Sequence, residues 1–227
     1  MRIKLKKNIN DNWVFRKASD KKWLEAQVPG CVHTDLHDNN LIPDPFYGTN
    51  EKDLQWISDE NWEYKKIIDV DNEFLSREVQ LLRFYGLDTY ARVFINGSLF
   101  IASNNMFHPW DVDDKGNFKL GRNEILVFFD SPIKKVLPKM NKMTYELPAD
   151  NDQIKKTSPH TRKAPYHYGW DWGPSFATCG IWQNVKIIAY DSFIISNVYV
   201  DQKEIQSDVA KIKISVTINS EVESDVE

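Results

Sequence analysis

Short strand-like runs follow one another along the chain, and no long amphipathic helix separates them. The clearest is ARVFINGSLFIAS (91–103), in which Asn96-Gly97 lies between two apolar runs. Asn-Gly tolerates the positive φ angles of a type I′ turn, so this segment predicts a β-hairpin. Similar runs, each bounded by turn-forming residues, are RIKLK (with Ile3 and Leu5 on one face), YKKIIDV, VQLLRFY, EILVFF and VKIIAY. Crossover helices do not alternate with these strands, so the pattern predicts an all-β sandwich with jelly-roll topology.

Two short segments favour helix. TDLHDNN (34–40) predicts one or two helical turns with Thr34 as the N-cap. SPIKKVLPKM (131–140) places Pro132 at a first helical position, and Pro138 limits the length of that helix.

The pattern changes after Asp191. FIISNVYVDQKEI (193–205) and VAKIKISVTINSEVESDVE (209–227) predict two alternating strands without an aromatic-rich loop between them. Two strands cannot bury a core alone, so we expect one domain over residues 1–191 and the first hairpin of a second β domain over residues 192–227. Such a hairpin would expose its edges unless it packed on a neighbour.

Charge and hydropathy exclude several partners. The net charge is −4 and both signs are interspersed, which argues against nucleic-acid binding. No apolar run approaches the length of a membrane span. The start, MRIKLKKNIN, lacks the apolar centre of a signal peptide, which leaves cytoplasmic and exported locations both open. The two cysteines, Cys31 and Cys179, are expected to be free thiols rather than a disulfide.

The histidines do not form a metal motif. His33 and His37 lie four residues apart, but no further ligand follows at a fitting spacing, so neither a metal nor a cofactor is expected. His160 and His167 flank Arg162 and could line a pocket or simply lie in a loop. The chain has 33 acidic residues, so no pair of carboxylates can be singled out as a hydrolytic pair.

YHYGWDWGPSF (166–176) is the most unusual segment, with five aromatic residues and Asp171 between Trp170 and Trp172. One interpretation is structural: a tryptophan-rich plug between two sheets, with Asp171 capping a turn. The other is a sugar site. Indole faces pack on the C–H face of a pyranose, and a carboxylate accepts hydrogen bonds from two hydroxyls, at about 1.5–3 kcal/mol each.

Five segments in order resemble the N-terminal domain of β-mannosidases of glycoside hydrolase family 2. They are VPGCVHTDL (28–36), DPFYGTNEKDLQWI (44–57), FYGLDTYARVFING (84–97), NNMFHPWDVD (104–113) and YGWDWGPSFATCGIWQNVKIIAYD (168–191). The resemblance covers about residues 10 to 191. Related β-galactosidases and β-glucuronidases share the domain, but the WDWGP run favours the mannosidase branch.

The resemblance implies a jelly-roll sandwich of the galactose-binding type, then an immunoglobulin-like domain of which residues 192–227 would be the first strands. A (β/α)₈ barrel with the two catalytic glutamates follows in that family. The parent would be a retaining exo-β-mannosidase that removes terminal β-linked mannose from oligosaccharides. The expected partners are that glycan and the missing C-terminal barrel of the same chain. This part of it would be inactive alone and would hold no catalytic residue.

The resemblance also implies roles for single residues. Asp171 would contact hydroxyls of the sugar in the −1 subsite, with Trp170 lining the same subsite. Trp172 would be a packing residue, because neighbours in an extended loop face opposite ways, and the two indoles would orient Asp171 and exclude water. Asn50, in YGTNE, and Arg162 are further candidate contacts. A free-standing carbohydrate-binding module or lectin, and a purely structural sandwich, remain as alternatives.

Overall fold

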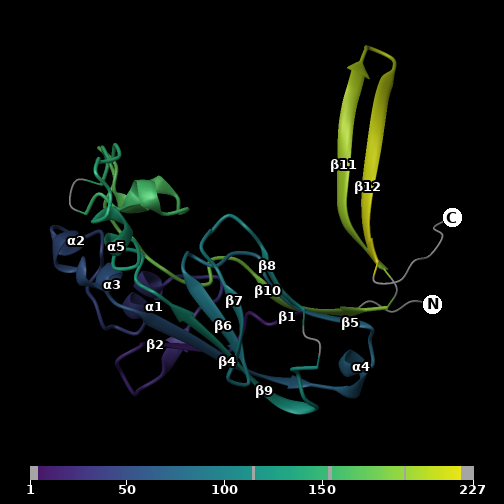
Figure 1. The fold of residues 1–227 in the computed structure, drawn as a ribbon, viewed down its shortest axis with the longest axis horizontal. Coiled ribbons are helices and arrows are strands. Elements are labelled where there is room, and N and C mark those ends of the chain that lie inside the picture. The colour runs from purple at the N-terminus through teal and green to yellow at the C-terminus, as the bar shows by residue number, and fades with distance from the viewer. Residues whose placement is uncertain (1–4, 114–115, 153–154, 192, 221–227) are drawn as a thin grey trace.

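Two antiparallel sheets form the body of the protein in the computed structural model, which describes residues 5–113, 116–152, 155–191 and 193–220 (Figure 1). The first sheet has the order β3 (Leu24–Ala26), β2 (Trp13–Lys17), β4 (Trp62–Val70), β9 (Gly121–Phe129), β6 (Ala91–Ile95) and β7 (Ser98–Ala102). The second has the order β1 (Leu5–Asn8), β10 (Val185–Tyr190), β5 (Val79–Phe84) and β8 (Trp110–Asp113). The prediction of an all-β jelly-roll sandwich is confirmed.

The core lies between the two sheets and follows the two-residue period of the strands. In β4, every second side chain from Trp62 to Val70 is buried. Leu82, Phe84 and Val185 meet that face from the other sheet, and all three are fully buried. Each large apolar side chain buried in this way contributes about 1.5–3 kcal/mol, so the sandwich has enough apolar burial to hold the loops that it carries.

Lys66 breaks the apolar pattern of β4. Its position in the alternation points into the core, and it is only 5% exposed. The ammonium donates a hydrogen bond to the backbone carbonyl of Asp11, which satisfies the buried charge locally.

The hairpin predicted at Asn96-Gly97 is confirmed. These two residues join β6 to β7, with φ angles of 50° and 86°. The Asn96 amide also donates to Asn123 Oδ1 at 2.9 Å, which ties the turn to β9.

The helices are short. They are α1 (Val32–Asp38), α2 (Asn50–Asp53), α3 (Trp56–Asp59), α4 (Asn72–Leu75), α5 (Leu137–Met140) and the 3₁₀ turns η1 (Ser158–His160) and η2 (Pro165–Tyr168). Among the described residues, no helix is long and apolar enough to cross a bilayer.

The predicted N-cap of α1 is wrong, because Cys31 holds that position and Thr34 lies at the third helical position. The helix begins earlier because Thr34 reaches back: the Cys31 amide donates to Thr34 Oγ1 at 3.3 Å, as in a capping box.

The helix predicted from Pro132 is also misplaced. Residues 132–136 form turns, and α5 begins only at Leu137, with Pro138 in its first turn. Pro138 has no N–H for the carbonyl of residue 134, so a helix that began at Pro132 could not continue through it.

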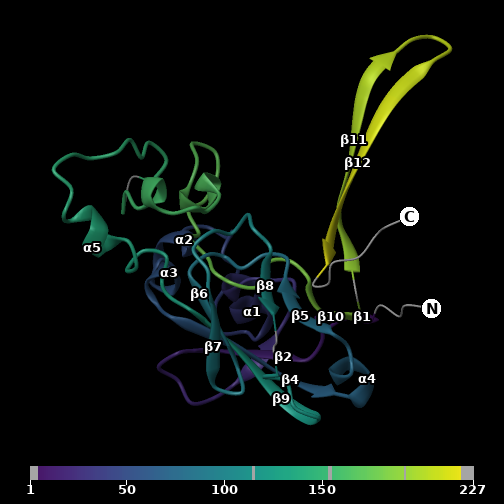
Figure 2. The same ribbon diagram turned by 45° about the vertical axis from the view of Figure 1, so that its right-hand side comes forward.

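The two predicted strands after Asp191 form a long hairpin, β11 (Phe193–Ile205) and β12 (Ala210–Ser220). Beyond its base, where Ile194 packs on the sandwich, it stands away from the two sheets (Figures 1 and 2). Residues 221–227 of the second predicted strand, and Ile3 of the first run, lie outside the described residues.

The hairpin has one apolar face. Along β12 the apolar side chains alternate with polar ones, and the register pairs Val198 with Val216 and Val200 with Ile214 on the same side. Two irregularities in β11, at 195–197 and 202–204, shift its phase. Because of these shifts, Ile195, three residues before Val198, lies on that side as well. So does Ile205, five residues after Val200. These side chains are about half exposed to two-thirds exposed, so the face has no cover within the described residues.

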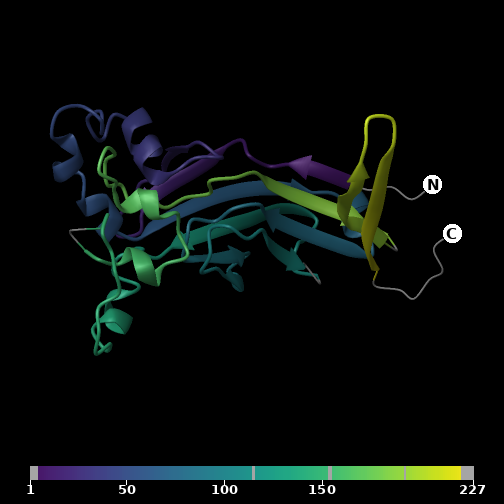
Figure 3. The ribbon, with the colours of Figure 1, turned by 90° about the horizontal axis from the view of Figure 1, so that it is seen from above.

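Between β9 and β10 the chain makes a long excursion, from residue 130 to 184, that contains no strand in its described part. Figure 3 shows its helical turns gathered with α2 at one end of the sandwich, while the hairpin stands at the opposite end. The aromatic segment predicted to carry function belongs to this excursion.

Candidate functional site

The aromatic segment forms a tight turn. The Trp170 amide donates to the Gly173 carbonyl at 3.2 Å and the Gly173 amide donates back at 3.3 Å, so Asp171 and Trp172 occupy the tip. Gly169, just before, has φ of 108°, a conformation that an L-residue rarely adopts. The sequence Gly-Trp-Asp-Trp-Gly-Pro therefore projects its central residues away from the backbone that supports them.

Both indoles at this turn reach solvent. Trp170 is 41% exposed and Trp172 81%, and their rings meet edge to face with centroids 5.4 Å apart. The expectation that Trp172 packs into the protein is wrong. It rested on an extended loop, whereas the two tip residues of a tight turn both point outward.

Asp171 is also exposed. The expectation that the indoles exclude water from this carboxylate is therefore wrong for the chain by itself. The alternative of a plug between two sheets is contradicted as well, since the turn lies outside the sandwich core.

A cavity of about 980 Å³ opens beside the turn. Its lining comes from residues 27–38, from the loop 44–46 and from residues 166–178. Its aromatic side chains are Phe46, Tyr166, Trp170, Trp172 and Phe176. Of the five site residues predicted from sequence, the cavity brings together Trp170 and Trp172, while Asp171, Asn50 and Arg162 lie outside its lining.

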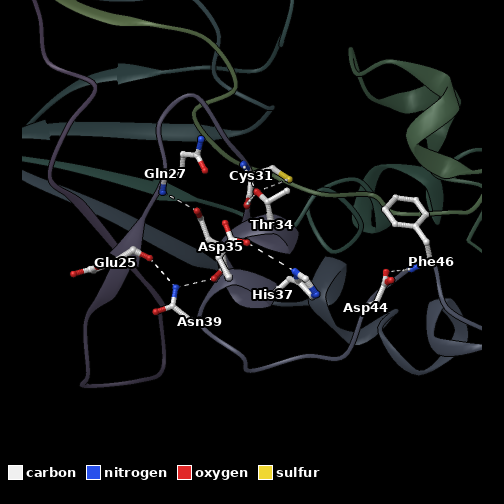
Figure 4. Close-up of polar contacts among 10 residues, drawn as sticks. Glu25, Gln27, Cys31, Thr34, Asp35, His37, Asn39, Asp44 and Phe46 are labelled. Carbon is white, nitrogen blue, oxygen red and sulfur yellow. Dashed lines mark hydrogen bonds and ion pairs between the residues drawn. The ribbon is translucent and has the colours of Figure 1, made fainter.

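One wall of the cavity is α1 with the loop that follows it (Figure 4). Asp35 fixes this helix: it accepts a hydrogen bond from the Gln27 amide at 2.8 Å and another from the Tyr64 hydroxyl at 2.5 Å. Burial raises the pKa of Asp35 to about 6, although the Tyr64 hydrogen bond opposes the shift. The helix is thus attached to the sheet through a buried carboxyl group.

Asn50 supports the next part of the same wall. Its side chain donates to the Asp44 carbonyl at 2.8 Å, and Asp44 Oδ1 accepts from the Phe46 amide at 2.9 Å. These bonds hold the loop that carries Phe46, whose ring meets Phe176 edge to face at 5.6 Å.

Two neutral histidines line the inner end of the cavity. His33 Nδ1 lies 2.8 Å from Thr178 Oγ1, and the Phe176 ring lies 5.2 Å from the imidazole. Burial, then the charge of Lys163, lowers the pKa of His33 to about 3. The same two causes, in the same order, lower the pKa of His167 to about 4. Both rings are therefore uncharged near neutral pH and can donate or accept hydrogen bonds.

His160 and Arg162 lie elsewhere. His160 lines a separate cavity of about 490 Å³ with residues 140–147. The Arg162 side chain is exposed, and its carbonyl accepts from the Met106 amide at 3.1 Å. Within the described ranges, no three His, Cys, Asp or Glu side chains gather as a metal site would require.

Cys31 and Cys179 are free, as expected. The Val32 amide donates to the Cys179 carbonyl and the Gly30 amide to the Ile181 carbonyl. This pairing places the backbone of Cys31 against Gly180.

Sequence reasoning missed several residues of this site. Phe46 and Phe176 lie in segments that had been quoted for the resemblance, and an aromatic in each was the available signal. Asp88 and Lys163, which form a buried ion pair beneath the cavity, had no signal, because a charged residue in a loop is ordinarily exposed.

Comparison with known proteins agrees with the resemblance. The family model described as "Glycosyl hydrolase 2 galactose-binding domain-like" matches residues 13–183. The beta-mannosidase B of Thermothelomyces thermophilus is 33% identical over 96% of this chain, and the beta-mannosidase of Bos taurus is 34% identical over 81% of it. The crystal structure of a beta-D-mannosidase from Dictyoglomus thermophilum is 36% identical, with a TM-score of 0.89 over 95% of the chain.

The matches cover only a part of each relative. The chain spans 25% of the fungal protein, 21% of the bovine one and 26% of the Dictyoglomus chain. The family model nevertheless covers the whole six-stranded sheet, strands β5 and β8 of the other sheet, and the aromatic turn. The chain belongs to the glycosyl hydrolase 2 galactose-binding domain-like family.

Proposed function

We propose that this chain is the N-terminal part of a retaining exo-β-mannosidase and that it shapes the subsite for the terminal mannose of a β-mannoside oligosaccharide. The observation that carries the proposal is the likeness to the Dictyoglomus beta-D-mannosidase, at 36% identity over 95% of the chain. The family match over residues 13–183, which includes the aromatic segment, supports the same proposal.

The geometry of the turn supports this role. Two indoles and a carboxylate project from a tight tip, and Trp172 is 81% exposed. Several large apolar side chains exposed together, as Phe46, Tyr166, Trp170 and Trp172 are around the cavity, mark a surface that a partner covers. A neighbouring catalytic domain would supply that cover and would exclude water from Asp171, which the indoles alone do not.

Within that site, Asp171 would accept hydrogen bonds from two hydroxyls of the sugar, and Trp170 would pack on its C–H face. Such bonds to a charged acceptor are worth about 1.5–3 kcal/mol each. Trp172 would contact the catalytic domain or the sugar. Direct sugar contacts by Asn50 and Arg162 stay predictions, and Asn50 also supports the cavity wall through Asp44.

The chemistry itself would belong to a barrel domain further along the chain, with one glutamate as nucleophile and another as acid and base. We assign neither role to a residue described here. Residues 1–191 would form the first domain, and the hairpin from residue 192 onward would begin an immunoglobulin-like domain.

A free-standing lectin is the second candidate, because five aromatic side chains of this chain line one cavity, as in a binding site for a small ligand. A lectin would bind the sugar without any further domain, whereas the mannosidase needs one.

The test is hydrolysis of a chromogenic β-mannoside by a parent chain that continues through the barrel, beside this chain and a β-galactoside control. The proposal expects activity in the parent only, and on the mannoside only. Activity on the galactoside would contradict the proposed specificity for β-mannosides. An inactive parent, combined with mannose binding by this chain, would overturn the enzyme in favour of the lectin.

A further inference from the structure

The loop that carries the aromatic turn is closed at its base by one side chain. Lys163, at the start of the loop, extends its ammonium to the carbonyl of Thr178, at the end, over 2.8 Å. The fourteen intervening positions, 164–177, include the turn and four of the five cavity aromatics, all except Phe46. Both ends are buried, with Lys163 4% and Thr178 8% exposed, so this bond lies inside the protein and is shielded from water.

The Lys163 ammonium also pairs with the Asp88 carboxylate, and neither side chain is more than 2% exposed. Asp88 is itself fixed to the segment that follows the loop: its amide donates to the Gly180 carbonyl at 3.0 Å, and its carbonyl accepts from the Gly180 amide at 3.1 Å. Asp88 therefore holds Lys163 in one place relative to the far end of the loop.

A third contact joins this base to α1. Thr178 Oγ1 lies 2.8 Å from His33 Nδ1. Further hydrogen bonds act from the side, where Gln55 donates to the Ser175 carbonyl at 2.8 Å and the Ser175 amide donates to Glu51 at 2.7 Å. Apolar contacts hold the loop as well, because Tyr168 is buried against Ile133 and Phe176 meets Phe46 edge to face.

A buried ion pair is a poor source of stability, since apolar residues of similar size usually do as well or better. What such a pair supplies is a single geometry, because a buried charge has few acceptable positions. We propose that the Asp88–Lys163 pair is a positioning clamp that closes the base of the aromatic loop and sets where Trp170, Asp171 and Trp172 are held. The inference deepens the proposed function, and only its kinetic test rests on that function.

The first test uses this chain and its indole N–H signals in ¹H–¹⁵N NMR spectra. The double variant Lys163→Met/Asp88→Asn removes both charges together, so no unpaired charge stays buried. The clamp predicts that the Trp170 and Trp172 signals shift or broaden. The Trp13 and Trp62 signals stay in place, because those indoles donate within the core, to the carbonyls of Ile9 and Ile57.

Lys66→Met is the matched control, because Lys66 is as buried as Lys163 but binds the Asp11 carbonyl, away from the loop. It should leave the Trp170 and Trp172 signals unchanged. Unmoved signals of these two indoles in the folded double variant, or equal movement in the control, would overturn the clamp.

A second uncharged pair, Lys163→Gln/Asp88→Asn, covers the case in which the first double variant does not fold. It also leaves no unpaired charge buried, and its two side-chain amides keep hydrogen-bonding groups inside the protein. The same two signals must move, though less, and their constancy would contradict the clamp.

The second test is kinetic and uses the parent enzyme on a chromogenic β-mannoside. Misplacing a positioned group by about 1 Å can cost on the order of 10²-fold, so the double variant should lower kcat/KM on that scale while the Lys66→Met control does not. Unchanged kcat/KM in the double variant would overturn the clamp. If the unmodified parent has no mannosidase activity, the proposed function fails, and the NMR result still decides the clamp.

Discussion

The buried carboxyl group of Asp35 makes the stability of the protein depend on pH. It lies between α1 and the sheet, 1% exposed, and burial raises its pKa to about 6 from an ordinary value near 3.8. The native state therefore binds this proton more tightly than the unfolded state does. The contribution of Asp35 to stability is full below about pH 4 and is lost as the pH rises through about 6.

We expect Asp35→Asn to remove this dependence. The free energy of unfolding of the variant, relative to the original chain, should rise by about 2.5 kcal/mol between pH 4 and pH 7, since one pKa unit corresponds to about 1.4 kcal/mol and the unfolded carboxyl is already about half ionised at pH 4. The difference between the two chains isolates Asp35 from His33 and His167, whose lowered pKa values act in the opposite sense. Urea unfolding at several pH values measures it, and a difference that stays constant would contradict the assignment.

Replacing Trp172 and replacing Trp13 should affect stability very differently. Trp172 is 81% exposed and Trp13 only 1%. Trp172→Ala should change the free energy of unfolding by no more than about 0.5 kcal/mol, whereas Trp13→Ala should cost about 3–5 kcal/mol. Denaturant titration of the two variants compares them directly. A large loss of stability in Trp172→Ala would show that Trp172 packs against the protein, contrary to its exposure in the structure.

At the scale of elements, the strands were the part that sequence could predict. In β4 and β9 one face is buried, so apolar and polar side chains alternate along the sequence, and Asn96-Gly97 is a local turn signal. Short helices were harder to place, since the start of α1 depends on how Thr34 bonds backward and α5 depends on where Pro138 interrupts.

The long excursion between β9 and β10 could not be predicted beyond its motif. Its shape depends on contacts between distant segments, such as Lys163 with Asp88 and Ser175 with Glu51. A sequence pattern over a few neighbouring residues does not predict contacts between residues that are far apart in the chain. For the same reason sequence singled out Trp170 and Asp171 as special but misjudged how exposed their turn would be.

The exposed hairpin of β11 and β12 should cause this chain to self-associate. Its apolar face, which includes Val198, Val200 and Ile214, is uncovered in the described structure. Exposed apolar faces and strand edges of this kind favour association. Sedimentation velocity should show concentration-dependent self-association of this chain.

The variant Val200→Lys/Ile214→Lys should remove that association, because the two residues are paired across the strands at the centre of the face. Asp201→Asn/Lys213→Gln, a pair on the opposite polar face, is the matched control and should associate like the original chain. A monomeric original chain would contradict the expectation that this face is built to be covered.

At the scale of the whole molecule, the two exposed features lie at opposite ends. The aromatic turn and its cavity occupy one end of the sandwich, and the hairpin stands at the other (Figure 3). In the proposed enzyme both ends would be covered by later parts of the chain, the hairpin by its own domain and the turn by the catalytic barrel. The sandwich would act as a rigid support that holds a substrate-orienting loop against a separate domain.

The central claim is that this domain contributes Asp171 to an active site whose catalytic residues lie in another domain. The most direct measurement is kcat/KM on a chromogenic β-mannoside for the parent enzyme carrying Asp171→Ala, with Asp20→Asn, an exposed acid in another turn, as control. Losing two hydrogen bonds to a charged acceptor predicts a fall of about 10²-fold or more, with the thermal midpoint and the control unchanged. Near-normal kcat/KM in Asp171→Ala would contradict the account.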